Sequence, residues 1–260
     1  MVKRKVGLVF AVVVFTAVLL GGSVISPAAE KKVYIVASEL AWPPFEWKDE
    51  AGNAVGFDLD VMREIAEVEG YKIEIVDVAW DTIIAGVVAG KYDIGASGFT
   101  IKPKRAEQVD FSEPYYLSDQ AVLIRKDSGL NIITALSEGR KVGAQTGTTG
   151  ADWIKYNLVE QGVKVELQRY ESYPLAVLDL INKNIDAVIQ DEPASKAFVA
   201  QEETIEIAGI IVTGEEFGFL VQKGDPYGLL LKINRGMKKL KASGVWNRLT
   251  TKYFVEYFSK

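Results

Sequence analysis

The feature that most constrains the fold is a repeated alternation of short apolar runs with amphipathic helical segments. The first series has an apolar run over 32–37, a helical segment over 59–69 that is closed by Gly70, and another run over 72–76. A second series of the same kind begins with the run at 141–144. Alternating strands and helices build parallel sheets with crossover helices, so the sequence predicts an α/β protein. Because the two series follow one plan, we expect two similar α/β lobes rather than a single sheet.

Apolar spacing, together with glycine and proline signals, sets the helices that we expect. They cover 59–69, 82–89, 132–139, 150–161, 174–183, a segment from Pro193, 227–243 and 245–254. An apolar run at 120–124 is expected to be extended and to carry the chain away from the first series.

The composition excludes several classes of function. A chain of 260 residues with 48% hydrophobic content can bury one large core or two smaller ones. A net charge of −5 argues against a nucleic-acid partner. The sequence has no cysteine and no histidine, which excludes disulfides, thiolate or imidazole metal sites, and nucleophile–histidine catalysis. We therefore expect no metal and no cofactor, and an enzyme would have to use carboxylates, lysine or tyrosine.

The N-terminus has the order of a secretory signal peptide. Three basic residues at 3–5 precede an uncharged apolar run over 6–20, and small residues follow around 26–29. We expect residues 1–29 to be a cleavable signal peptide. Because no cysteine follows the run, a lipid anchor is not expected, and the mature protein should be periplasmic.

A stretch of small residues at 95–98 follows the last strand of the first series and leads to Pro103 at the start of a helix. Small residues let a ligand approach the backbone. Thr100 adds a hydroxyl and Arg105 a guanidinium, which suit a carboxylate or phosphate because both anions accept two parallel hydrogen bonds. The segment 95–105 therefore predicts an anion-binding loop, unless it is only a tight turn with a solvated arginine.

Two further loops lie at the ends of strands in the second series. The segment 145–150 consists of glutamine, threonine and glycine before a helix and lacks the pattern of a nucleotide-binding P-loop. Asp191, within 190–193, also ends a strand. Both loops could simply cap the helices that follow them. As a site residue, Asp191 would bind a ligand cation.

Together the three loops supply one cation, one anion and several neutral donors at the carboxyl ends of strands, where open α/β sheets bind ligands. This set complements an α-amino acid zwitterion. Trp42 and Trp80 could form aromatic walls for the ligand side chain, although tryptophans also serve as core residues. Glu39 could place an anion at the far end of the pocket.

The chain resembles the periplasmic amino-acid-binding proteins of ABC importers, which include lysine/arginine/ornithine-, histidine- and glutamine-binding proteins. The resemblance extends over essentially everything after the signal peptide. Its most specific segments are 44–46, 56–60, 98–105, 110–112, 115–116, 147–150 and 186–191.

This resemblance implies a role for each candidate residue. Arg105 would bind the α-carboxylate of the ligand, and Asp191 would bind the α-ammonium group. Trp42 and Trp80 would enclose the ligand side chain. The other candidates in the two glycine- and threonine-containing loops would assist with the carboxylate or line the pocket: Ser97, Gly98, Thr100, Thr146 and Thr149.

Glu39 stands where related proteins keep an aspartate that contacts the distal nitrogen of the ligand. A carboxylate opposite aromatic walls suits a guanidinium or ammonium group, which favours arginine, lysine or ornithine. Gly150, where basic-amino-acid binders often carry glutamine, and Lys102, where threonine is usual, leave glutamine or another polar amino acid open. The enzymatic alternative is a periplasmic lyase similar to cyclohexadienyl dehydratase, with Glu39 or Asp191 as general base. We expect a binding protein rather than an enzyme.

The resemblance also implies the type II periplasmic binding protein fold. Residues 30–121 and 216–260 would form lobe 1, residues 125–212 would form lobe 2, and the hinge would lie near 122–126 and 212–217. A free amino acid would bridge the lobes and favour their closure. The closed form would then dock on an ABC permease in the inner membrane.

Overall fold

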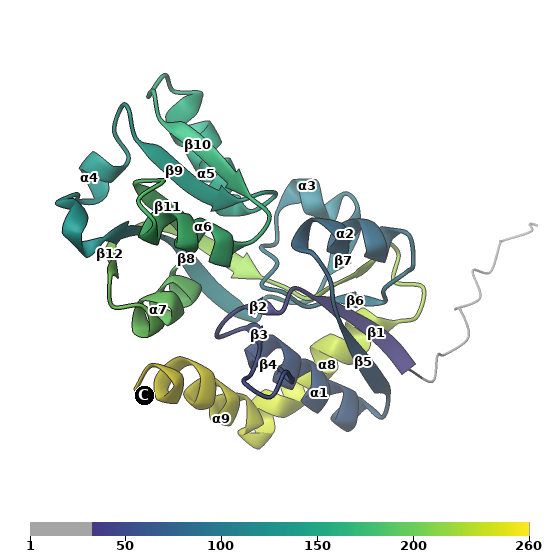
Figure 1. Cartoon of the computed structure of the whole chain (residues 1–260). Helices are drawn as coiled ribbons and strands as arrows, with labels where there is room; N and C mark the ends of the chain where they lie inside the picture. The colour runs from purple at the N-terminus through teal and green to yellow at the C-terminus, as the bar shows by residue number, and fades with distance from the viewer. Residues whose placement is uncertain (1–32, 260) are drawn as a thin grey trace, which may run out of the picture.

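The computed structural model describes residues 33–259 and contains two α/β lobes that face each other (Figure 1). The expected signal peptide lies outside the described residues. The strands are β1 (Val33–Ser38), β2 (Ala41–Trp42), β3 (Glu46–Lys48), β4 (Ala54–Val55), β5 (Lys72–Asp77), β6 (Ile94–Gly95), β7 (Val109–Phe111), β8 (Tyr116–Arg125), β9 (Lys141–Gln145), β10 (Glu166–Tyr170), β11 (Ala187–Asp191), β12 (Ile205–Phe217) and β13 (Leu220–Gln222).

The α-helices are α1 (Phe57–Glu69), α2 (Trp80–Val88), α3 (Pro103–Ala106), α4 (Ile132–Ala135), α5 (Thr149–Ile154), α6 (Tyr173–Ile181), α7 (Glu192–Gln201), α8 (Leu229–Ser243) and α9 (Val245–Thr251). Short 3₁₀ or π turns complete the elements: η1 (Lys126–Ser128), η2 (Lys155–Val159), η3 (Lys252–Glu256) and η4 (Tyr257–Ser259). No helix among residues 33–259 has both the length and the apolar character that crossing a bilayer requires.

The two main sheets share one strand order, which confirms the expected pair of similar α/β lobes. In the first sheet, β5-β1-β6-β13-β7, the strands β5, β1 and β6 are parallel. In the second sheet, β10-β9-β11-β8-β12, the strands β10, β9 and β11 are parallel. In each lobe the first parallel strand therefore lies between the second and the third. The carboxyl ends of these parallel strands meet at the cleft between the lobes.

Helix α1 illustrates how the local sequence sets an element and its packing. Its apolar residues Leu59, Met62 and Ile65 are fully buried, because their spacing places them on one face. Gly70 ends the helix in the left-handed conformation with φ 75°, and its N–H donates hydrogen bonds to carbonyl groups of the last turn. The buried face packs against α8, which follows 160 residues later in the chain.

Not all of the expected helices keep their full length in the structure. The helix expected over 245–254 ends as α9 at Thr251 and continues as the π-helical turn η3. Helix α4 ends at Ala135 instead of continuing to residue 139, since the Ser137 hydroxyl donates to the Thr134 carbonyl and the chain turns there. The helix expected over 150–161 divides into α5 and the π-helical turn η2. Apolar spacing alone does not register such local competition for backbone groups.

The chain passes between the lobes along two antiparallel strands, β8 and β12. Residues 120–124 of β8 already pair with β11 inside the second sheet, whereas residues 116–118 pair only with residues 215–217 of β12. From this pairing we propose that the first crossing lies at 116–119, while the hinge expected near 122–126 and 212–217 stays a prediction. Figure 1 shows both strands running from the teal and green lobe into the other lobe.

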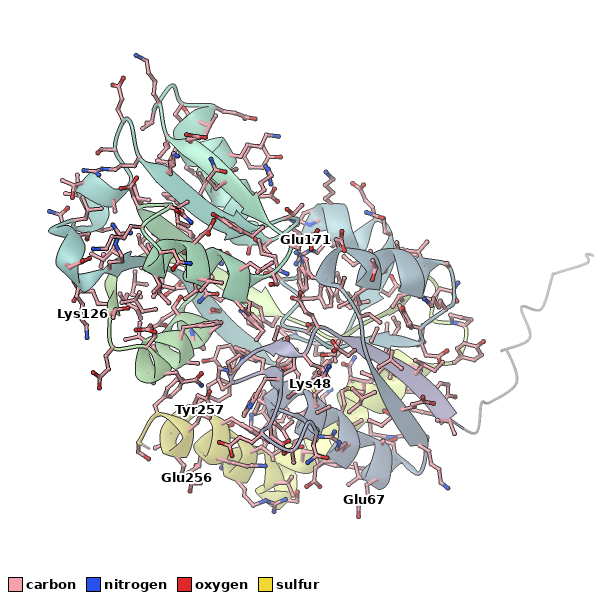
Figure 2. The ribbon with its side chains drawn as sticks, in the orientation of Figure 1. Lys48, Glu67, Lys126, Glu171, Glu256 and Tyr257 are labelled. Atoms are coloured by element: carbon pink, nitrogen blue, oxygen red, sulfur yellow. The ribbon has the colours of Figure 1, made fainter. Side chains whose placement is uncertain are left out.

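An aromatic cluster surrounds the crossing strands and joins the cores of the two lobes. The ring of Phe45 lies 5.1 Å from that of Tyr116 and 5.5 Å from that of Phe217, measured between centroids. The C-terminal segment adds Phe254, which stacks on Tyr116 at 4.8 Å. Charged side chains cover the outer surfaces of both lobes, and Glu171 lies where the lobes face each other (Figure 2).

Candidate functional site

The candidate site is a cleft of about 320 Å³ between the lobes. The residues come from loops at the carboxyl ends of strands in both sheets, from β2 and β3, and from the first turns of α5 and α6. The lining residues are Glu39, Trp42, Glu46, Trp80, Ser97, Gly98, Thr100, Arg105, Gln145, Thr148, Thr149, Tyr173 and Asp191.

Nearly all of the residues selected from the sequence meet in this cleft, and Thr146 is the exception. The Thr146 side chain is exposed and is not part of the lining, and its neighbour Thr148 takes that place. Sequence reasoning did not select four of the lining residues: Glu46, Gln145, Thr148 and Tyr173. Gln145 and Thr148 lie inside the predicted loop at 145–150, so the sequence predicted the loop but only Thr149 among its lining side chains.

Arg105 is the cation of the site and is only 5% exposed. Its guanidinium donates to the Thr100 carbonyl at 3.0 Å and, across the cleft, to the Gly147 carbonyl at 3.1 Å. Burial lowers its pKa to about 10, so the group stays charged at neutral pH. Helix α3 has only four residues, which makes its dipole a minor contribution. The anion-binding character of the loop therefore depends on the guanidinium rather than on a helix N-terminus.

The loop after β9 supplies neutral groups from the second lobe. Thr148 is the N-cap of α5, and its hydroxyl accepts from the Ala151 N–H at 3.3 Å. Gly150 has no room for a side chain, because a Cβ would lie 2.9 Å from the Ile189 carbonyl oxygen and 3.0 Å from Gln120 Oε1. The glycine at 150 thus reflects the space that Gln120 occupies.

Aromatic rings form two sides of the cleft. Trp80 stacks on Phe99 with centroids 4.4 Å apart and an interplanar angle of 13°. The Arg105 guanidinium carbon lies 5.4 Å from the Trp80 ring centroid, a cation–π distance. Trp42 packs directly over Gly98, where a Cβ would fall 1.9 Å from the indole. Gly98 also has φ 55°, so both the backbone and the space require glycine.

Glu39 faces the second lobe across the cleft. Both of its carboxylate oxygens accept from Gln145 Nε2, at 3.0 and 2.8 Å, and the same nitrogen donates to the Glu171 carbonyl. Burial raises the pKa of Glu39 to about 7, against the opposing effect of the Gln145 hydrogen bond. The group can therefore change its charge near neutral pH.

Glu46 contributes a second carboxyl group in the first lobe. Its Oε1 accepts from the Ser97 hydroxyl at 2.8 Å, and its Oε2 is buried with no hydrogen-bond partner among residues 33–259. Asp58 lies nearby and accepts from the Tyr115 hydroxyl at 2.6 Å and the Gly98 N–H at 3.0 Å. Burial and the charge of Asp58 raise the pKa of Glu46 well above its usual range.

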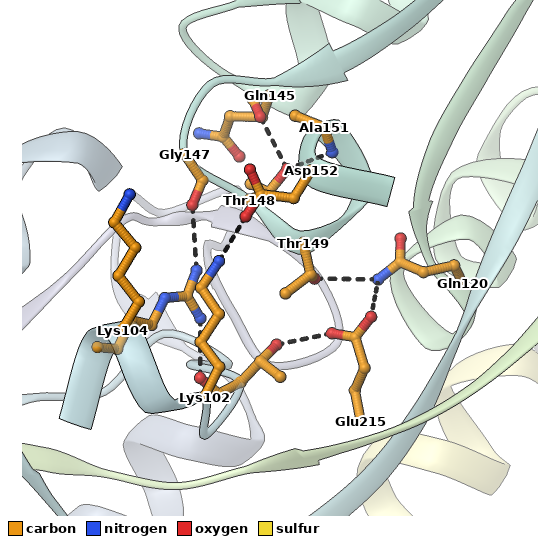
Figure 3. A network of polar contacts seen from close by, with 12 residues as sticks. Lys102, Lys104, Gln120, Gln145, Gly147, Thr148, Thr149, Ala151, Asp152 and Glu215 are labelled. Carbon is orange, nitrogen blue, oxygen red and sulfur yellow. Dashed lines mark hydrogen bonds and ion pairs between the residues drawn. The ribbon is translucent and has the colours of Figure 1, made fainter. Parts of the chain in front are cut away.

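Asp191 ends β11 in the second lobe and is 5% exposed. Burial raises its pKa well above the usual range, and the charge of Glu215 acts in the same direction. Gln120 Nε2 donates to Asp191 Oδ1 at 3.1 Å, and Figure 3 shows this amide between Thr149 and Glu215. Among the described residues, the lining contains three carboxyl groups and one guanidinium, so the cleft favours a cation.

One ion pair joins the lobes beside the cleft. Lys102 Nζ lies 2.6 Å from Asp152 Oδ2, and Figure 3 shows the lysine reaching toward the loop of the second lobe. With the contacts Arg105–Gly147 and Glu39–Gln145, this pair shows that the lobes are in contact across the cleft. Across residues 33–259, no group of three or more acidic side chains is arranged to hold a metal ion.

Comparison with known proteins assigns the chain to a family. The model of the bacterial extracellular solute-binding proteins, family 3, matches residues 34–256. The chain belongs to this family. A probable histidine-binding protein of Neisseria gonorrhoeae is 32% identical over 240 residues, which cover 91% of this chain and 88% of that protein. The two-lobe architecture of this family member is thus the type II periplasmic binding protein fold, as expected.

Two solved structures of ancestral binding proteins are similar to this family member over most of its length. An ancestral arginine-binding protein bound to arginine is 34% identical, with a TM-score of 0.81, covering 86% of this chain and 99% of that one. An ancestral amino acid-binding protein, described as a precursor of cyclohexadienyl dehydratase, is 32% identical, with a TM-score of 0.78, covering 86% and 96%.

Proposed function

We propose that this solute-binding protein captures a free polar L-amino acid, with a basic side chain favoured, and delivers it to an ABC permease in the membrane. The observation that carries the proposal is a single buried cleft in which a guanidinium from one lobe and a carboxylate from the other face an excess of acidic side chains. The expected location is the periplasm, which is consistent with membership of an extracellular family.

The two fixed charges suit the two ends of a zwitterion. Arg105 would bind the α-carboxylate, assisted by Ser97 and Thr100 from its own lobe and by Thr149 from the other. Asp191 would bind the α-ammonium group. Charge-assisted hydrogen bonds of this kind contribute about 1.5–3 kcal/mol each, so a few of them approach the roughly 8 kcal/mol of a micromolar complex.

The distal end of the cleft would accept a second cationic group. Glu39 offers a carboxyl group, and Glu46 adds a buried Oε2 that lacks a partner among residues 33–259. Trp42 and Trp80 border the same space, and their faces suit a guanidinium or ammonium group. This arrangement favours arginine, lysine or ornithine over glutamine, although the Gln145 amide would also suit a neutral polar side chain.

Closure follows from the location of the charges on different lobes. A ligand that contacts Arg105 and Asp191 together gains contacts in the closed state that the open state lacks, and only such differential affinity shifts the equilibrium. Several similar proteins are named for histidine or arginine, which supports a basic ligand, whereas others are named for cystine or were solved with glutamine bound. The similarity to a precursor of cyclohexadienyl dehydratase bears on the lyase alternative. We favour binding without chemistry, because binding a cation would account for the buried carboxyl groups.

A thermal-shift screen of the twenty amino acids and ornithine tests the proposal. A ligand present at a hundred times its Kd stabilises the folded protein by about 2.7 kcal/mol. We expect arginine, lysine or ornithine to raise the unfolding temperature most, histidine and glutamine less, and acidic amino acids not at all. The D-enantiomer of the best ligand is the control. A preference for acidic or large apolar amino acids would contradict the basic assignment, and no response to any of them would contradict amino-acid binding.

A further inference from the structure

The two crossing strands carry a polar pair that links the lobes, formed by Gln120 on β8 and Glu215 on β12. Gln120 is fully buried, and its Nε2 donates to Asp191 Oδ1 at 3.1 Å, Glu215 Oε1 at 3.1 Å and Thr149 Oγ1 at 3.3 Å. The other oxygen of Glu215 accepts from the Thr100 hydroxyl at 2.8 Å. Figure 3 shows this connection from the second lobe, through both crossing strands, to the first lobe.

The three acceptors around Gln120 exceed what its amide can satisfy. An amide nitrogen has only two hydrogens, so one acceptor at a time is left with a weaker bond. Two of the acceptors, Asp191 and Glu215, are carboxylates that repel each other, and this repulsion adds to burial in raising the pKa of Asp191. An ammonium group placed at Asp191 would supply the missing hydrogen-bond donor and would offset the repulsion between the two carboxylates.

Glu215 does not line the cleft, so it acts through its neighbours rather than by touching a ligand. We propose that Gln120 and Glu215 are positioning residues for the ligand's α-ammonium group, Gln120 by orienting the Asp191 carboxylate and Glu215 by adding a second negative charge beside it. This inference rests on the proposed function, since it assumes that Asp191 receives an α-ammonium group. It also explains Gly150, because a larger residue there would displace the Gln120 side chain.

The test compares two ligands that differ only in the amine. These are L-arginine and 5-guanidinopentanoic acid, which lacks the α-amino group, measured by direct and competition calorimetry. Glu215→Gln keeps an acceptor for the Thr100 hydroxyl and removes the charge. We expect its affinity for arginine to fall about tenfold and its affinity for the analogue to change less than about twofold, because only the first ligand carries the group that the charge attracts.

Glu216→Gln is the matched control, since this neighbouring glutamate is exposed on the same strand and should leave both affinities unchanged. Gln120→Leu provides a second variant, with ligand-free thermal unfolding to check its folding. It should lose more affinity for arginine than for the analogue. Equal losses for both ligands, or no loss for either, would overturn the inference.

The two hypotheses can fail separately. If the wild-type protein prefers another L-amino acid, the same comparison is made with that amino acid and its analogue without the amine. Binding that is indifferent to Glu215→Gln overturns the positioning role and leaves the proposed function intact. Wild-type protein that binds no amino acid overturns both.

Discussion

The third parallel strand of each lobe ends at the cleft, and the two ends carry opposite charges. After β6 the chain forms an irregular loop that folds the Arg105 guanidinium back into the cleft. After β11 the ten-residue helix α7 begins at once, and Asp191 stands at its start. The strand order makes the loop at 95–105 the counterpart of the segment that begins at Asp191.

The first parallel strands of the two lobes also end in complementary groups, here a carboxyl group and an amide. Glu39 follows β1, Gln145 ends β9, and their side chains hydrogen-bond across the cleft. Equivalent positions in the two sheets thus carry complementary groups rather than identical ones. A repeated fold supplies the geometry twice, and the difference between the lobes is what the proposed recognition of a ligand with two different ends requires.

Removal of the cation from this pair should have the largest effect. We expect Arg105→Ala to weaken binding of the preferred amino acid at least about a hundredfold, because the α-carboxylate would be buried without its charge partner. Isothermal titration calorimetry measures the affinity. The exposed neighbour Lys104→Ala is the control and should bind normally. Unchanged affinity in Arg105→Ala would show that the two strand ends do not bind the ligand's two ends.

Ligand affinity should depend on pH through the pair of Glu39 and Gln145. Because burial raises the pKa of Glu39 to about 7, the group gains its negative charge between about pH 6 and 8, and affinity for arginine should rise about tenfold over that interval. Glu39→Gln should flatten this rise, as followed by calorimetry at each pH. Glu171→Gln, an exposed carboxylate next to the same contact, should keep it. An undiminished rise in Glu39→Gln would assign the titration to another group.

The same group affects the ligand-free protein with the opposite sign. A carboxyl group whose pKa is higher in the folded state than in the unfolded state holds its proton longer when folded. The contribution of Glu39 to the free energy of unfolding should therefore fall as the pH rises from about 4.5 to about 7, and Glu39→Gln should lack this contribution. Chemical denaturation over this interval provides the measurement.

The ion pair outside the cleft should have the smallest effect. Lys102→Met removes the contact with Asp152 that joins the lobes, and we expect affinity to fall about two- to fivefold, since partly exposed ion pairs contribute little. The difference from wild type should shrink in 0.5 M salt because exposed charges are screened. Lys104→Met is the control. A loss as large as that of Arg105→Ala would mean that closure, not ligand contact, dominates the affinity.

Local sequence signals were sufficient for most of the fold and for three of the four charged residues that line the site. Small residues after a strand, a proline at a helix start and an arginine two residues later all act within a few positions, so the loop at 95–105 could be found directly. The residues that were missed act over long sequence separations. Glu46, in the short strand β3, accepts a hydrogen bond from the Ser97 hydroxyl. Glu215, in β12, accepts one from the Thr100 hydroxyl.

The sequence by itself determined two α/β lobes, a cation on one and an anion on the other, because periodicity and turn chemistry are local properties of a chain. Only the tertiary structure decided which groups face each other across the cleft: Arg105 with Gly147, Glu39 with Gln145, and Lys102 with Asp152. It also revealed the linking pair of Gln120 and Glu215 and the strand pairing from which we propose a first crossing at 116–119. These contacts depend on how two separately folded sheets are joined, and no local pattern in the chain specifies that.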